Sequence, residues 1–442
     1  MTATQEKSYP SAMARLEAAI ERIHSPEAEN VFTAVFADSA RWEAEAADRR
    51  AAAGASRGPL DGRIVSVKAL FDVAGTVTSS GSAVLRRLRP AVEDAEVVKR
   101  LRAAGAIVIG KTQMTEFAFS ALGTNPHDGM PANPRDRTRV PGGSSAGAVV
   151  SVIGGMADIA IGSDTGGSLR IPAALSGAVG FKPTSGFVPT AGAFSLSSSL
   201  DTIGPIAANV ADCFVADQVL SGEGAPSPLR PASPGTFRLN IARGRLFDRC
   251  EPEVLAAFEK AMKRLRSGGL QVKEGTIEAA LDDLAQIDKI GTFPSIEVGA
   301  TLRSLGVSAL DGVDPRTRVR IEAGAGILAT DYVRMMRLRQ AAIRSFEQSF
   351  SNNELFVLPT TPVRAPLISS VAEDAAFHEL NGLVLRNPRI ANLLDCPSIS
   401  LPLPLEGLPV GLMLIGRRNA DRRLVEIAAS VEALLRGHLH AA

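Results

Sequence analysis

Residues 141–170 read PGGSSAGAVVSVIGGMADIAIGSDTGGSLR and carry two glycine-flanked serines, Ser144 and Ser168, on either side of an apolar run. A glycine- and serine-rich run can be a flexible linker or a set of tight turns. A solvated linker would not contain the apolar residues of 148–161, so we expect this run to be buried. Its spacing predicts a helix over 145–153, a strand over 158–161 and a second helix over 169–175.

The same alternation of helix and strand extends over the rest of the chain. We expect further helices at 12–23, 39–53, 95–104 and 421–435, and strands at 63–67, 106–109, 354–358, 399–401 and 410–415. The Pro/Ser-rich stretch 226–234 is interpreted as a surface crossing, because the sheet needs strands from both sides of it. We therefore predict an α/β fold: one large domain, 1–442, with a central mixed β-sheet covered by helices on both faces.

The two serines indicate nucleophilic chemistry, and Ser168, preceded by Thr165-Gly166-Gly167, is the better placed. Glycines allow backbone N–H groups to approach a reacting oxygen closely. A serine also needs a base, and we expect each of the five histidines to be a solvated surface group: His24, His127, His378, His438 and His440. Lys68 closes an apolar strand and can serve as the base instead, because burial lowers the pKa of a lysine.

At these residues the chain resembles the amidase signature family, whose motifs are GGSS and G-[ST]-D-x-G-G-S-[IVL]-R-x-P. Here the second motif is GSDTGGSLRIP at 162–172. The resemblance implies a Ser-Ser-Lys triad in which Ser168 is the acyl-forming nucleophile, Ser144 bridges from a cis peptide, and Lys68 is the base. It also implies an oxyanion hole built from the backbone N–H groups of Thr165, Gly166, Gly167 and Ser168. We expect Arg170 and Asp164 to order the turn rather than to take part in catalysis.

The likeness extends beyond a signature core at about 62–204. Residues 199–205 resemble the S-x-D-T-x-G-P element of many members, and 396–402 and 407–413 resemble their C-terminal elements. Met413 stands where glutamine is common in the family. In the family, loops between the core and the C-terminal strands shape the acyl pocket, and the corresponding segments here, 191–199 and 291–340, follow no pattern that the sequence explains. Phe117, Phe119 and Phe194 are candidates for an aromatic pocket wall, although packing in the core is the simpler interpretation.

A competing motif lies at 105–112, where GAIVIGKT satisfies the phosphate-loop pattern G-x-x-x-x-G-K-[ST]. A phosphate loop requires a strand before its first glycine and an irregular loop after it. Here the preceding residues have helical spacing and 106–109 is a continuous apolar run. We therefore expect Gly105 to cap a helix and reject nucleotide binding at this segment.

Composition excludes several other classes of function. A net charge of +1 gives no field that would attract nucleic acid or an anionic membrane, and no run of eighteen apolar residues exists. Three scattered cysteines indicate neither a disulfide framework nor a metal site, and no apolar segment follows the charged N-terminus, so we expect a cytoplasmic protein without a cofactor.

The resemblance implies a stand-alone amidohydrolase that cleaves a small carboxylic amide. The alternative is the glutaminase (A) subunit of a tRNA-dependent amidotransferase, in which a glutamine follows the motif arginine and a cysteine lies a few residues on. The residues here are Ile171 and Ser176, which disfavours that alternative. A non-enzymatic relic of the fold is a third option, but it gives no reason to retain Lys68, Ser144 and Ser168 together. The sequence leaves open whether the chain acts as a homodimer.

Overall fold

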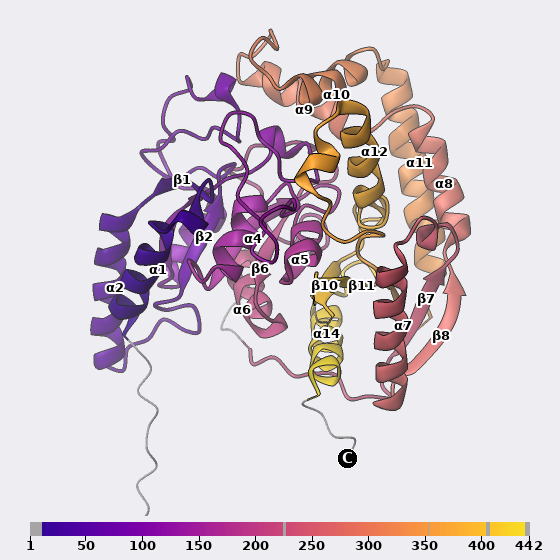
Figure 1. Cartoon of the computed structure of the whole chain (residues 1–442), viewed down its shortest axis with the longest axis horizontal. Helices are drawn as coiled ribbons and strands as arrows, with labels where there is room; N and C mark the ends of the chain where they lie inside the picture. Colours follow the sequence, from indigo (N-terminus) through magenta and orange to yellow (C-terminus); the bar gives the residue numbers. More distant parts are fainter. Residues whose placement is uncertain (1–10, 224–226, 352, 404–406, 438–442) are drawn as a thin grey trace, which may run out of the picture.

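The computed structural model describes residues 11–223, 227–351, 353–403 and 407–437. The described strands form one mixed sheet in the order β1-β3-β2-β4-β6-β5-β10-β11-β9-β7-β8. Figure 1 shows β1 and β2 on one side of the molecule and β7 and β8 on the other. Their bounds are β1 Phe32–Val35, β2 Ile64–Lys68, β3 Ile107–Thr112, β4 Ile159–Asp164, β5 Val179–Lys182, β6 Thr202–Ala207, β7 Arg238–Arg243, β8 Gln271–Thr276, β9 Glu354–Pro359, β10 Ser398–Pro402 and β11 Gly411–Ile415. The sheet includes strands from both sides of 227–234, as we predicted; Pro226 lies outside the described residues.

Two parallel groups of strands are joined by antiparallel ones. β3, β2 and β4 run parallel, as do β9, β7 and β8. Between these groups, β6, β5, β10 and β11 pair antiparallel with their neighbours. The prediction of an α/β fold with a mixed sheet is confirmed.

Helices cover both faces of the sheet. Their bounds are α1 Ala12–Ile23, α2 Ala37–Ala52, α3 Glu96–Ala103, α4 Ala146–Ile153, α5 Arg170–Ser176, α6 Val210–Ser221, α7 Pro252–Ser267, α8 Glu278–Asp288, α9 Phe293–Ser304, α10 Pro315–Ala325, α11 Ala329–Gln348, α12 Asp374–Leu385, α13 Arg389–Leu393 and α14 Asp421–Arg436. In Figure 1, α9, α10 and α12 lie at the top of the molecule, and α14 lies at the bottom.

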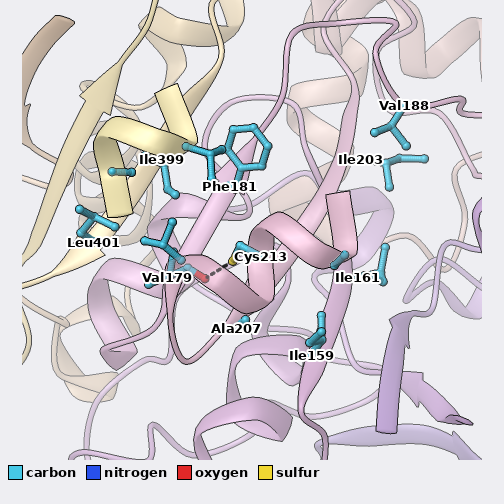
Figure 2. Packing of buried hydrophobic residues seen from close by; sticks show 14 of the residues in the cluster. Ile159, Ile161, Val179, Phe181, Val188, Ile203, Ala207, Cys213, Ile399 and Leu401 are labelled. Carbon is cyan, nitrogen blue, oxygen red and sulfur yellow. Dashed lines mark hydrogen bonds between the residues drawn. The ribbon is translucent and has the colours of Figure 1, made fainter. Parts of the chain in front are cut away.

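The alternation of side chains along β4 explains why both faces need covering. Ile159 and Ile161 pack in the same core cluster as Cys213 of α6, whereas Ala160, between them, packs with Val149 of α4. Successive residues of a strand point to opposite faces, so a central strand that is apolar throughout must be buried on both sides. Figure 2 shows the α6 side of this packing, where the Cys213 thiol donates to the Val179 carbonyl.

The segment 105–112 is not a phosphate loop. Gly105 follows α3 with a φ of +82°, a left-handed conformation that glycine adopts without steric cost. Gly110 and Lys111 lie inside β3, and Lys111 Nζ donates to the Val77 carbonyl. The interpretation of Gly105 as the end of a helix is confirmed.

Several elements were absent from the expectations, among them β7, β8 and the helices α8 to α11. The pattern of β8 explains its omission, because it is an edge strand whose residues are mostly exposed and polar. Such a strand has little of the apolar alternation by which strands are recognised.

Candidate functional site

Lys68 is the last residue of β2, an interior strand of the sheet. It lies where the parallel strands β2 and β4 have their carboxyl ends. Ligand sites in sheets of this kind lie beyond the carboxyl ends of the strands. The Lys68 side chain has no exposed surface, and its Nζ lies 2.6 Å from Ser144 Oγ and 3.0 Å from Ser163 Oγ. The lysine therefore contacts two hydroxyl groups in the interior of the protein.

Burial lowers the pKa of Lys68 from 10.5 to about 7. The negative charges of Asp164 and Asp201 oppose this shift but do not cancel it. A group with this pKa exists as a neutral amine in a large fraction of molecules near neutral pH, and a neutral amine can accept a proton.

Ser144 lies directly before the N-terminal end of α4, and the Gly143–Ser144 peptide bond is cis. The Ser144 carbonyl accepts a hydrogen bond from Thr115 N, and Gly143 N donates to the Ala121 carbonyl. These contacts fix the backbone on both sides of the hydroxyl that faces Lys68.

Ser168 lies in the turn between β4 and α5 and lines a cavity of about 100 Å³. Gly167 before it has a φ of +132°, and a Cβ there would lie 2.6 Å from Ile171 Cδ1 and 2.7 Å from Pro388 Cβ. Only glycine fits this turn. Lys68 Nζ is hydrogen-bonded to Ser144 Oγ. Within the described residues, Ser168 Oγ has no hydrogen bond to Ser144 Oγ.

Asp164 and Arg170 hold the turn, as we expected. Both side chains are fully buried and form an ion pair at 2.9 Å. Asp164 also accepts from Gly167 N at 2.7 Å and Leu169 N at 3.1 Å, and Asn392 Nδ2 donates to it at 2.8 Å. Burial alone would raise the pKa of Asp164, but Arg170, Lys182 and the amide of Asn392 lower it to about 2.

The backbone N–H groups of the turn differ in their availability. Gly167 N–H donates to Asp164 Oδ1, so this residue contributes its conformation rather than a free donor. The N–H groups of Thr165, Gly166 and Ser168 donate to no acceptor within the described chain. The turn therefore offers three free donors beside the Ser168 hydroxyl, where the resemblance implied four.

Asp201, in a neighbouring segment, holds the side chain of Thr165, the first of these three residues. Thr165 Oγ1 donates to Asp201 Oδ1 at 2.5 Å, and Ser195 Oγ and Ser197 N donate to the other carboxylate oxygen. Burial raises the pKa of Asp201 to about 6, although these hydrogen bonds oppose the rise.

The cavity at Ser168 has a mainly apolar wall with a few polar groups. Its lining comprises Ala118, Phe119, Ser120, Thr165, Gly166, Ser168, Leu196, Leu200, Ile287, Asp288, Gly291, Thr292, Phe293, Pro294, Arg320, Leu385, Arg389 and Leu393. Segments 191–199 and 291–340, whose sequences follow no recognisable pattern, both contribute residues to this lining. Of the three candidate phenylalanines, Phe119 lines this cavity, whereas Phe117 stacks on Phe194 at a centroid distance of 5.5 Å.

The prediction for His127 was wrong. Its side chain is mostly buried, and Nε2 lies 3.1 Å from Oε1 of the buried Glu116, to which Ser82 Oγ also donates. Nothing in the turn-rich local sequence indicates this contact, because Glu116 comes from a separate segment. His438 and His440 lie outside the described residues, as does the N-terminal stretch 1–10.

Ser163, Asp201 and Arg320 were not assigned to the site from the sequence. Ser163 stands inside the second motif, which was the available signal in the sequence, but its place beside Lys68 depends on the pairing of β4 with β2. Arg320 lies in α10 within a segment that shows no recognisable motif.

No helix in the described ranges is both long enough and apolar enough to cross a membrane.

Comparisons with known proteins identify the family of the chain. The family model described as Amidase matches residues 14–425. A 2-amino-5-chloromuconic acid deaminase of Comamonas testosteroni is 35% identical over 409 residues, which cover 90% of this chain and 87% of the relative. The A subunit of a glutamyl-tRNA(Gln) amidotransferase from Symbiobacterium thermophilum is 33% identical over 465 residues, which cover 97% of this chain and 94% of that relative.

Among solved structures, one described as the crystal structure of an amidase superposes with a TM-score of 0.86 at 30% identity. The match covers 96% of each chain. Sequence and fold thus agree over nearly the whole length, and the relatives act on carbon–nitrogen bonds. The chain belongs to the amidase signature family and is an amidase, a hydrolase of carbon–nitrogen bonds.

Proposed function

We propose that this amidase cleaves small carboxylic amides through an acyl-Ser168 intermediate, with Ser144 as the bridge and Lys68 as the general base. The observation that supports this most strongly is the 2.6 Å contact between Lys68 Nζ and Ser144 Oγ in an environment that lowers the pKa of the lysine to about 7. A base of this pKa suits proton transfer at neutral pH.

In the first step, Ser168 Oγ attacks the amide carbon while its proton passes to Ser144 and the Ser144 proton passes to neutral Lys68. The tetrahedral oxyanion accepts hydrogen bonds from the free N–H groups of the Ser168 turn, and one such donor contributes ~3–4 kcal/mol. The C–N bond then breaks, and the proton returns through Ser144 to the leaving nitrogen. Water hydrolyses the resulting ester by the same relay in reverse and releases the acid and free Ser168.

The test is a panel of aliphatic amides, aryl amides, ureas and glutamine, with wild type and Ser168→Ala compared by release of ammonia or amine. A fluorophosphonate should add once, at Ser168, as read by peptide mass. Labelling of another serine with parallel loss of activity would reject the assignment. Esters of the same acids should react as well, because an alkoxide leaves more readily than an amine.

The alternative function is that of a glutaminase subunit in an amidotransferase, since several relatives carry that name. Two positions disfavour it, because Ile171 and Ser176 stand where the resemblance implies a glutamine and a cysteine in that subunit. Both residues are fully buried, and Ser176 Oγ donates to the Pro141 carbonyl at 2.9 Å. Serine-dependent turnover of glutamine alone, appearing only with co-purified partner subunits, would favour the alternative.

A further inference from the structure

We propose that Glu297 of α9 is a positioning residue that decides which acyl groups the cavity at Ser168 accepts. Its carboxylate holds residues 195–199, called here the serine segment, so that Leu196 and Leu200 stay in the cavity wall. This inference rests on the proposed function of Ser168, because it concerns the choice of substrate in the same cavity.

The backbone of the serine segment has few partners. The segment reads Ser-Leu-Ser-Ser-Ser at 195–199 and lies outside the helices and strands, shortly before β6. Within the described chain, two of its backbone N–H groups find an acceptor, those of Ser197 and Ser199. Ser197 N donates to Asp201 and Ser199 N donates to Glu297, both at 3.0 Å. Side-chain carboxylates, rather than sheet pairing, therefore hold this backbone.

The Glu297 carboxylate accepts hydrogen bonds from two sides. Its Oε2 accepts from Ser197 Oγ at 2.6 Å as well as from Ser199 N. Its Oε1 accepts from Ser199 Oγ at 2.5 Å and from the hydroxyl of Tyr332, in α11, at 2.6 Å. Glu297 is buried and forms no ion pair with the described residues, so these hydrogen bonds stabilise its charge. Hydrogen bonds to an ionised acceptor are stronger than those between neutral groups.

A second carboxylate, that of Asp201, holds the serine segment from the side of the catalytic turn. Ser197 is fully buried and contacts both acids, since its N–H donates to Asp201 and its hydroxyl donates to Glu297. Asp201 also accepts from Thr165 Oγ1. Thr165 carries one of the free N–H groups beside Ser168. The serine segment is thus fixed between α9 and the turn that bears the nucleophile.

The position of this segment matters because the cavity is small. Leu196 and Leu200 line the cavity together with Phe293 of α9. The Phe293 ring packs edge-on against Tyr332 at a centroid distance of 6.0 Å, so Glu297 connects the elements that form this part of the wall. The cavity volume of about 100 Å³ is below the ~150 Å³ of a cavity that accepts benzene. A small displacement of the two leucines therefore changes which acyl groups fit.

Two substitutions of Glu297 separate its hydrogen bonds from its bulk. Glu297→Met keeps a side chain of similar length but removes both acceptor atoms. Glu297→Gln keeps a carbonyl oxygen for Ser197 Oγ and Ser199 N. Its NH₂ group then faces the hydroxyls of Ser199 and Tyr332, and a hydroxyl can accept a hydrogen bond as well as donate one. Gln is thus the conservative variant that should restore the function lost in Met.

The experiment measures kcat/KM for butyramide and for the bulkier benzamide, and compares the ratio of the two values. Wild type should favour butyramide, and Glu297→Met should lower this ratio by roughly tenfold or more. Glu297→Gln should keep the ratio within about twofold. Leu196→Ala should shift the ratio in the same direction as Glu297→Met, and the double variant should shift it no further, because both changes act on one wall. Arg303→Met alters an exposed residue of the same helix and should leave the ratio unchanged.

Hydrogen exchange provides a readout that does not depend on turnover. The amides of 195–199 should exchange faster in Glu297→Met and at the wild-type rate in Glu297→Gln. An equal loss of kcat/KM for both amides would show that Glu297 only stabilises the fold, and would overturn the inference. Faster exchange with an unchanged ratio, or a Gln variant as impaired as Met, would also overturn it.

The Ser168→Ala variant separates this inference from the proposed function. Cleavage that requires Ser168 but has a ratio independent of Glu297 would overturn the inference while the proposed function stands. Cleavage that persists in Ser168→Ala would overturn the proposed function. In that variant, calorimetric binding of butyramide and benzamide still tests the wall, and a preference that Glu297→Met removes would retain the role of Glu297.

Discussion

Lys68 Nζ lies 2.6 Å from Ser144 Oγ, and neither residue has exposed surface. A buried ammonium would need strong charged partners, but the nearest groups are the hydroxyls of Ser144 and Ser163. This arrangement favours the neutral amine, which is the form that can accept a proton from a serine.

Removal of the side chains proposed to form the relay should lower turnover strongly without unfolding the protein. Ser168→Ala should lower kcat by roughly 10⁴-fold or more, and Ser144→Ala and Lys68→Ala by about 10²–10⁴-fold each. The double variant Ser144→Ala/Lys68→Ala should be hardly worse than either single variant, because the groups act as one relay. Steady-state kinetics measures this, and additive losses would contradict a shared relay.

The pH profile should follow the ionisation of Lys68. Its lowered pKa of about 7 predicts that kcat/KM rises about tenfold per pH unit below pH 7 and levels off above it, since only the neutral amine accepts the proton. His127→Gln serves as a control and should leave the profile in place. A profile that disappears in this variant would instead favour a histidine base.

The same pKa predicts a pH-dependent stability difference. Between about pH 7 and 10.5, Lys68 is protonated in the unfolded state but neutral in the folded state. The free energy of unfolding of the wild type therefore rises with pH over this range. Below pH 7 both states are protonated, and burial of the charge costs ~5 kcal/mol. Lys68→Met removes this cost, and its stability relative to wild type should fall by roughly 3 kcal/mol from pH 6 to pH 9. Urea unfolding at both pH values measures it, and a difference independent of pH would refute the lowered pKa.

The ion pair of Asp164 with Arg170 should matter chiefly for structure. Arg170→Met leaves a buried carboxylate without its cation, which should cost about 3–5 kcal/mol. Asp164 has a pKa of about 2, so its contribution is present above the unfolded value near 3.8 and is lost as the pH falls through about 2. Thermal unfolding at neutral pH tests the variant, and an unchanged Tm would contradict this role.

Activity should survive exhaustive dialysis against EDTA, because the proposed relay and the free N–H donors supply nucleophile, base and charge stabilisation. Loss of turnover that a divalent ion restores would refute this prediction.

The sequence alone determined the framework of the site. The apolar runs around Ser144 and Ser168 predicted the strand and helices that carry them, because the spacing of apolar residues along the chain indicates which side chains a helix or strand buries. The residues of 162–172 indicated the amidase family, and the helical spacing before Gly105 was sufficient to reject the phosphate loop. These inferences succeed because each depends on neighbours in the chain.

Only the tertiary structure decided what surrounds those residues. Ser163 is the second partner of Lys68 because β4 lies beside β2, and the pKa of Lys68 is lowered because the folded chain buries its side chain completely. Arg320 lines the Ser168 cavity from a helix more than 100 residues away in the sequence. His127 contacts Glu116 across a shorter, irregular segment that has no α-helical or strand pattern. Burial, electrostatic environment and cavity lining depend on distances between segments remote in sequence, and residue order by itself does not encode those distances in any local pattern.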